Sequence, residues 1–195
     1  MNVIDQKLAL EKLNNGLPII FQTDTLPAIG CLPKFSDIIY KVKKRDLNKP
    51  LILMGAENYQ FNEFVHKSAL DDYLYMASKY WPGPLTMIIP ISEKRKSLFS
   101  SNNFTLGLRI PNSTMAKFLI KESGPLLTSS ANLSGIPPAT SAKDISIELP
   151  NVDILGPLPW EKCSGKASTI ISWVHKGKWK IIRDCLLYTS PSPRD

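Results

Sequence analysis

The segment PLLTSSANLSG, residues 125–135, changes within a few positions from apolar to hydroxyl and amide side chains. Residues 125–129 are predicted to form a buried strand, and residues 130–135 a polar turn at its carboxyl end. Small polar side chains at the end of a strand are well placed to bind a ligand, and freed backbone N–H groups there can form an anion-binding nest. A plain helix cap is the alternative interpretation.

Helical and strand patterns alternate on both sides of this segment. Apolar residues at helical spacing predict helices at about 4–13, 36–42, 70–80, 115–120 and 141–149. Short apolar runs predict strands at 17–21, 51–54, 85–91, 104–110 and 152–155, with a hairpin formed by 168–174 and 179–183. This mixture predicts an α/β or α+β layered domain.

Length and composition are those of a globular protein. The chain has 195 residues, of which 43% are hydrophobic and 21% charged. We expect a single domain over residues 1–184. Residues 185–195 have no periodicity and carry two Ser-Pro steps, which predicts an irregular tail that is either disordered or not native to the protein.

The chain is basic, with 24 Lys and Arg against 17 Asp and Glu, a net charge of +7. This balance suits a phosphate-rich partner such as a nucleotide or RNA, although solvated lysines give the same balance. No apolar run is long enough to span a membrane, and residues 1–6 show no secretory signal, so a cytoplasmic location is expected. The cysteines and histidines lack metal-ligand spacing.

Three further segments carry candidate chemistry. QTDTLPAIG, residues 22–30, places hydroxyls and a carboxylate after a strand, where a small polar ligand or an ordinary turn would fit. KKRDLNKP, residues 43–50, offers Lys and Arg to a polyphosphate, or forms a solvated helix end. WPGPLT, residues 81–86, indicates a rigid structural corner. Walker and Rossmann glycine patterns do not occur.

Seven motifs in order resemble those of the YrdC-like family, the threonylcarbamoyl-AMP synthases. The motifs are Thr-Asp-Thr (23–25), Lys-x-Arg with Lys-Pro-Leu (43–51), Trp-Pro-Gly-Pro-Leu-Thr (81–86), Leu-Arg-Ile-Pro (108–111), Ser-Ala-Asn-Leu-Ser-Gly (130–135), Ala-Ser-Thr-Ile-Ile (167–171) and Ile-Ile-Arg (181–183). The resemblance implies a twisted open sheet flanked by helices, with a basic concave face.

The resemblance also implies an activity. Family members make L-threonylcarbamoyladenylate and pyrophosphate from L-threonine, bicarbonate or CO2, and ATP, as the first step of threonylcarbamoyladenosine modification of tRNA. Mg²⁺ is the implied cofactor, held by the ATP phosphates, with no protein ligand set assigned. The implied further partners are the downstream tRNA threonylcarbamoyl-transfer proteins, with tRNA or double-stranded RNA as a candidate contact.

Site residues follow from the matching motif positions. The catalytic group at the ATP phosphates is Lys43, Arg45, Ser130 and Asn132. Two more residues, Thr105 and Arg183, match positions on the nucleotide side. The positions that hold threonine are Thr23, Arg109, Thr128 and Ser168, with Arg109 expected to meet the carboxylate.

Several positions depart from the family pattern. The first motif usually reads Pro-Thr-Glu-Thr-Val-Tyr-Gly-Leu, and here Gln22, Asp24, Pro27 and Ala28 replace four of those residues, which removes an aromatic wall. Pro138 stands where many members carry a nucleotide-contacting serine. The usual Arg-x-Gly after the last strand is also interrupted, because Cys185 takes the place of the glycine.

Two alternative functions fit the same sequence. A non-catalytic RNA-binding or ribosome-maturation module of the same fold would explain the net charge equally well. A carbamoyl-transfer domain, like the one inside hydrogenase maturation proteins, uses similar carbamoyl-adenylate chemistry in a far longer chain.

Overall fold

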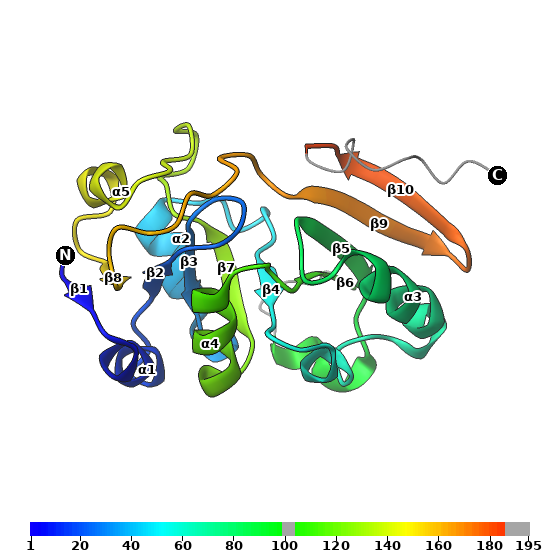
Figure 1. Cartoon of the computed structure of the whole chain (residues 1–195). Coiled ribbons are helices and arrows are strands. Elements are labelled where there is room, and N and C mark those ends of the chain that lie inside the picture. The colour runs from blue at the N-terminus through cyan, green and yellow to red at the C-terminus, as the bar shows by residue number, and fades with distance from the viewer. Residues whose placement is uncertain (99–103, 186–195) are drawn as a thin grey trace.

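The computed structural model describes residues 1–98 and 104–185 of the chain, so residues 186–195 of the expected tail lie outside the described residues. In this part of the chain a mixed ten-stranded sheet has the strand order β1-β8-β2-β3-β7-β4-β6-β5-β9-β10 (Figure 1). The strands are β1 (Val3–Ile4), β2 (Ile19–Phe21), β3 (Ala28–Cys31), β4 (Ile52–Met54), β5 (Leu85–Pro90), β6 (Thr105–Arg109), β7 (Leu126–Ser130), β8 (Asp153–Leu155), β9 (Thr169–His175) and β10 (Lys178–Arg183).

Helices flank this sheet, which confirms the expected layered α/β fold. The α-helices are α1 (Gln6–Asn14), α2 (Asp37–Lys43), α3 (Leu70–Tyr80), α4 (Thr114–Ser123) and α5 (Ala142–Glu148). Short 3-10 turns are η1 (Pro33–Phe35), η2 (Asn58–Phe61), η3 (Lys67–Ala69) and η4 (Glu93–Leu98). None of the helices among the described residues has the length and apolar character that crossing a membrane requires.

The middle of the sheet is buried on both faces. The neighbouring side chains of one strand, Ile19 and Ile20, enter two different apolar clusters because successive residues of a strand point to opposite faces. Ile19 belongs to the cluster that packs against α1 and α4, which lie side by side in Figure 1. The other collects residues from α2, α3 and α5.

Most predicted elements are present, and their local signals act as expected. The side chain of Ser113 accepts a hydrogen bond from the Ala116 N–H at 3.3 Å and caps α4. The corner at 81–86 ends α3, where the Trp81 indole donates to the Leu85 carbonyl at 2.7 Å. Ser36, the first residue of the predicted helix 36–42, makes no side-chain cap on α2, because its backbone is already helical and continues the preceding turn.

Two strands were not predicted. β1 has only two residues, and it exists because it pairs in parallel with β8. β3 contains Ala28 and Gly30, which have low strand propensity, and tertiary pairing with β2 and β7 overrides that preference. A Cβ at Gly30 would lie 2.9 Å from the Phe21 ring, so only glycine allows this close approach.

Leu53 tests the core directly, because its side chain is fully buried on a central strand. We expect Leu53→Ala to lower the free energy of unfolding by about 2 to 5 kcal/mol, through lost burial and the cavity left behind. Leu47→Ala removes the same atoms at a position that is 68% exposed, and it is the matched control. Urea unfolding followed by circular dichroism gives both values, and equal losses would contradict this description of the core.

Candidate active site

A cavity of about 460 Å³ opens on one face of the central strands. Its wall includes alternate residues of β4, β5 and β6, and Ile52 on β4 faces Thr128 on β7 in register. Ala28 and Met54 belong both to this wall and to the apolar cluster under α1 and α4. The cavity is therefore the part of that face which α1 and α4 leave open.

Seven of the ten predicted site residues line this cavity. They are Arg45, Thr105, Arg109, Thr128, Ser130, Ser168 and Arg183. The other three, Thr23, Lys43 and Asn132, are buried beside it and bond to the protein itself. Residues as far apart in the sequence as Arg45 and Arg183, which are 138 positions apart, thus lie around the same cavity.

Positive charge dominates the cavity wall. Arg45, Lys49, Arg109 and Arg183 line it together with several Ser and Thr hydroxyls, and the described lining residues include no Asp or Glu. Arg and Lys recognise phosphate by charge and hydrogen bonding, and hydroxyls add neutral donors and acceptors. The composition of the wall suits a polyphosphate ligand.

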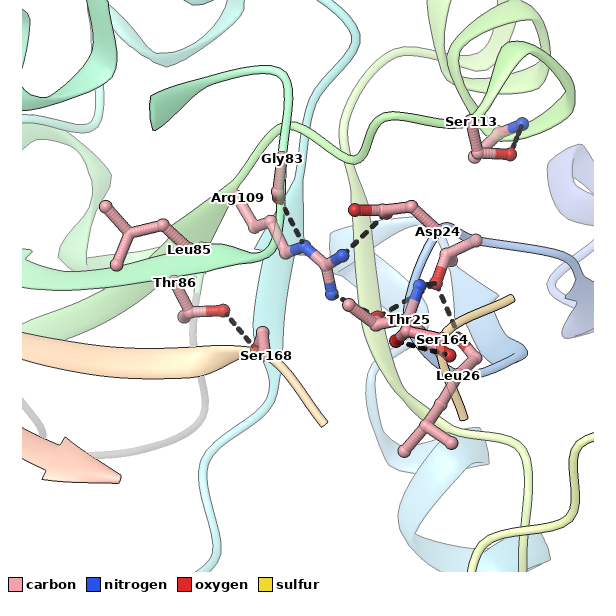
Figure 2. A network of polar contacts seen from close by, with 12 residues as sticks. Asp24, Thr25, Leu26, Gly83, Leu85, Thr86, Arg109, Ser113, Ser164 and Ser168 are labelled. Atoms are coloured by element: carbon pink, nitrogen blue, oxygen red, sulfur yellow. Dashed lines mark hydrogen bonds and ion pairs between the residues drawn. The ribbon is translucent and has the colours of Figure 1, made fainter. Parts of the chain in front are cut away.

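Arg109 lies at the centre of a buried polar network (Figure 2). Its side chain is 3% exposed and donates from Nε to the Gly83 carbonyl at 3.1 Å, from Nη1 to Thr25 Oγ1 at 2.7 Å, and from Nη2 to Asp24 Oδ1 at 2.6 Å. Burial lowers the pKa of the Arg109 guanidinium, and the Asp24 carboxylate opposes that shift. Three of its five N–H groups donate in these bonds, and Arg109 is also among the residues that line the cavity.

The corner at 81–86 is part of the site, a role that its sequence alone did not indicate. Gly83 supplies the carbonyl that fixes Arg109, and its N–H donates to the Ile110 carbonyl at 2.9 Å. A Cβ at Gly83 would lie 2.5 Å from the Tyr80 carbonyl oxygen, so any other residue would displace the corner. The sequence signal that could have indicated this role is a glycine between two prolines, Pro82-Gly83-Pro84.

Ser168 connects the wall to the last strand of the sheet. Its hydroxyl pairs with Thr86 Oγ1 at 2.9 Å, and both side chains are buried. The Ser168 carbonyl accepts from Arg183 Nε at 3.1 Å and from Arg183 Nη2 at 2.9 Å, which fixes that exposed guanidinium over the cavity. Thr86 is a second site residue that sequence reasoning missed.

The predicted threonines do different things. Thr128 Oγ1 lines the cavity but donates to the Ile52 carbonyl at 2.9 Å, a bond across β7 and β4. Thr23 is fully buried, and its hydroxyl donates to the Leu26 carbonyl at 2.7 Å. Thr23 therefore shapes the loop that carries Thr25, and Thr25 is the threonine of this motif that reaches the cavity.

The turn after β7 is tied down from behind by Lys43. Lys43 Nζ donates to the carbonyls of Ser130 and Asn132, while the Ser130 hydroxyl donates to Asn132 Oδ1 at 2.5 Å. Burial, with the nearby Arg45 charge, lowers the pKa of Lys43 to about 8. The two Nζ bonds hold the turn that presents the Ser130 hydroxyl to the cavity, although burial disfavours the charge of the ammonium group that makes them.

The anion-binding nest expected at this turn is not present in the structure. The N–H groups of residues 131–134 all donate within the protein, to Pro27, Ser130, Glu148 and Lys43 in that order. Asn132 Nδ2 likewise donates to the carbonyls of Leu133 and Ile136, both at 2.8 Å. The backbone turns its donors inward, so the recognition of an anion falls to side chains.

Arg45 stands on a loop that it organises itself. The loop leaves α2 through Lys44, whose left-handed backbone (φ 50°) ends the helix. Arg45 Nε donates to the Lys49 carbonyl at 3.2 Å and Nη2 to the Pro50 carbonyl at 3.0 Å. Half-buried in this way, Arg45 has a lowered pKa because burial disfavours its charge, and it is held toward the cavity.

Comparison with known proteins places the chain in a family. A family model described as "Telomere recombination", for Sua5, YciO and YrdC proteins, matches residues 11–185. The chain therefore belongs to the Sua5/YciO/YrdC family, which confirms the resemblance drawn from the seven motifs.

Curated relatives and solved structures agree with this membership. The threonylcarbamoyl-AMP synthase of Vibrio parahaemolyticus is 31% identical over 145 residues, which cover 72% of this chain and 78% of that protein. The structure of P. abyssi Sua5 complexed with L-threonine matches 95% of this chain with a TM-score of 0.83 and 25% identity, although the chain spans only 57% of that protein. E. coli YciO, 21% identical with a TM-score of 0.76 over 95% of this chain and 92% of its own, shares the fold. The expected class of enzyme, the threonylcarbamoyl-AMP synthases, is thereby confirmed.

Lys43 gives the site a pH-dependent stability. Its pKa in the folded protein is about 8, below the usual 10.5, so between these values the unfolded chain binds more protons and rising pH favours folding. We expect the free energy of unfolding of the wild type, relative to Lys43→Met, to rise by up to about 1.4 kcal/mol per pH unit between pH 8 and 10. Denaturant titrations at several pH values measure this difference.

The control for this titration is Lys41→Met, on the same helix. Lys41 is exposed, so its replacement should leave the pH dependence of the wild type unchanged. A wild type and a Lys43→Met variant that differ by the same free energy at pH 7 and pH 10 would show that Lys43 does not titrate in this range.

Proposed function

We propose that this chain makes L-threonylcarbamoyladenylate and pyrophosphate from L-threonine, bicarbonate or CO2, and ATP, the first step of threonylcarbamoyladenosine modification of tRNA. The observation that carries the proposal is the cavity itself. Four cationic side chains and a set of hydroxyls surround a space of about 460 Å³, with no carboxylate among its described lining residues. A cavity of that size and charge suits a nucleoside triphosphate with a small second substrate.

The reaction needs no nucleophile from the protein. The amine of threonine adds to CO2 and loses a proton to become a carbamate. A carbamate oxygen then attacks the α-phosphorus of ATP, and the bond to pyrophosphate breaks. The enzyme has to hold two anionic reactants together and stabilise the charge that moves onto pyrophosphate, so positioning and electrostatics provide the catalysis.

Roles in this scheme follow position in the cavity. Arg45 and Arg183 neutralise phosphate charge from two sides, with Thr105 beside the nucleotide. Ser130 hydrogen-bonds the reacting phosphate. Lys43 and Asn132 keep the Ser130 turn in place from behind it, and the Lys43 cation adds to the field that the triphosphate meets.

The amino-acid subsite lies around Arg109. Its two remaining N–H groups would bind the threonine carboxylate, and Ser168 and Thr128 line the same region. Thr23 acts indirectly, through the loop that presents Thr25.

In the proposed reaction, Mg²⁺ binds to the site together with ATP. Hydroxyls are the oxygen atoms that the cavity wall offers, and a carboxylate is absent from its described lining residues. Phosphate oxygens are better ligands for Mg²⁺ than serine or threonine hydroxyls, so we propose that the ion is bound as Mg-ATP, with Ser130 close to it. This function implies a cytoplasmic location, with tRNA and the downstream threonylcarbamoyl-transfer proteins as partners.

Pyrophosphate release tests the function. With ATP and Mg²⁺, release should require both L-threonine and bicarbonate, because the carbamate is the attacking group. Omission of either substrate should reduce release to background. ATP binding without any release would contradict the proposal, and salt-sensitive RNA binding in that case would favour the non-catalytic RNA module. Release with carbamoyl phosphate and no threonine would favour the carbamoyl-transfer alternative.

Arg45→Ala tests the phosphate site. Removal of a charged phosphate contact costs a few kcal/mol of transition-state stabilisation, so turnover should fall by about a hundredfold or more. Lys41→Ala removes a positive charge from an exposed position on α2, at the end of which Arg45 lies, and should keep near-native turnover. Equal turnover in the two variants, measured as pyrophosphate release, would exclude Arg45 from the role assigned to it.

A further inference from the structure

The carboxylate of Asp24 stands next to the place where a substrate carboxylate is expected. Asp24 Oδ1 is 2.6 Å from Arg109 Nη2, and the two side chains are 16% and 3% exposed. Asp24 does not line the cavity itself, so it meets the guanidinium from one side while the cavity opens elsewhere (Figure 2). The charge of Arg109 is therefore already balanced before any ligand binds.

The loop that carries Asp24 is anchored at several points. The Asp24 carbonyl accepts from the Ser164 N–H at 3.0 Å, and the Thr25 carbonyl accepts from the Gly165 N–H at 3.1 Å. The Thr25 hydroxyl accepts the second Arg109 bond at 2.7 Å. These bonds fix the backbone of residues 24 and 25 against the segment before β9, which places the Asp24 side chain beside Arg109.

Charge counting then sets a condition on the ligand. A carboxylate that binds the remaining N–H groups of Arg109 shares one buried positive charge with Asp24, so the group as a whole carries one negative charge. An uncompensated charge in a buried site is costly. A ligand that brings its own positive charge beside its carboxylate removes that cost, whereas a simple carboxylate does not. Among the other cations of the cavity wall, Arg183 acts electrostatically on Arg109, but its guanidinium is exposed and donates to the Ser168 carbonyl instead of forming a buried pair with the ligand carboxylate.

We propose that Asp24 is a specificity-determining residue that makes the amino-acid subsite select a zwitterion over a simple carboxylic acid. The proposal rests on the function proposed above and extends it, because it concerns which ligands Arg109 can hold. Asp24 acts through Arg109 and is a positioning residue in this scheme. Without its charge, Arg109 and a single carboxylate would form a neutral pair, and the requirement for an ammonium group would disappear.

Two ligands separate these cases. L-threonine and 2,3-dihydroxybutanoate have the same carboxylate and side-chain hydroxyl, but the second carries a hydroxyl in place of the ammonium group. Calorimetric titration of the full chain should show threonine binding at least about tenfold more tightly than the hydroxy acid. In Asp24→Asn this ratio should fall by about tenfold or more, through weaker threonine binding, tighter hydroxy-acid binding or both. Asp24→Glu keeps the charge and should restore the preference.

Two control variants isolate the charge. Thr25→Val removes the other side-chain partner of Arg109 without a change of charge, so both ligands should weaken together and their ratio should stay constant. Asp153→Asn removes the carboxylate of the Lys12–Asp153 ion pair at the edge of the sheet and should leave both affinities unchanged. A folded Asp24→Asn variant with the wild-type ratio would overturn the proposal.

The wild type alone provides a test that does not depend on variant folding, because equal affinity for the two ligands would also overturn the inference. Failure of the Asp24 proposal can be distinguished from failure of the proposed synthase function. Threonine-dependent pyrophosphate release without a preference for the zwitterion would overturn the role of Asp24 only. A preference without release would support Asp24 and overturn the synthase reaction, and binding of neither ligand would overturn both.

Discussion

The buried guanidinium of Arg109 holds together the segments around the candidate active site. Arg109 is almost completely enclosed, and a charge in that position requires partners. The protein supplies them from two distant parts of the chain, the loop at 24–25 and the corner at 83, which are 84 and 26 positions away from Arg109 at the nearest. Each partner is held in turn by its own backbone bonds, to 164–165 and to Ile110. The constraint on one side chain thus fixes the relative placement of four segments around the cavity.

Sequence patterns predicted the fold and most of the site because both rest on local signals in this chain. The segments predicted as strands at 51–54 and 125–129 form the central strands β4 and β7, and the second of them changes from Leu126 and Leu127 to hydroxyl side chains as it reaches the turn. The motif positions then converge because neighbouring strands bring alternate residues to the same face. Four of the seven predicted residues in the cavity wall, Thr105, Arg109, Thr128 and Ser130, lie on the neighbouring strands β6 and β7. Arg45 reaches the wall from the loop after α2, and Arg183 follows a register shift in the pairing of β10 with β9.

The remaining features depend on partners that spacing does not show. Lys43 looks like a free cation at a helix end, but the turn at 130–132 lies directly beyond it and takes its ammonium group inward. Gly83 and Thr86 look structural until Arg109 and Ser168, which lie far along the chain, are placed against them. β3 is a strand only because β2 and β7 flank it. In each case, a pairing between distant residues overrides a reasonable local interpretation.

The cationic groups divide into two electrostatic classes, and this division has a chemical consequence. Arg109 is neutralised by Asp24 inside the protein, whereas the described hydrogen bonds of Arg45 and Arg183 go to uncharged acceptors, which are backbone carbonyls and the Ser168 hydroxyl. In the proposed reaction, a polyphosphate therefore gains most from the second class, and a small zwitterion from the first. Two anionic groups must meet in that reaction although they repel each other. Separate cationic groups, one balanced in advance and the other open, allow both to bind in one cavity and bring their reacting atoms together.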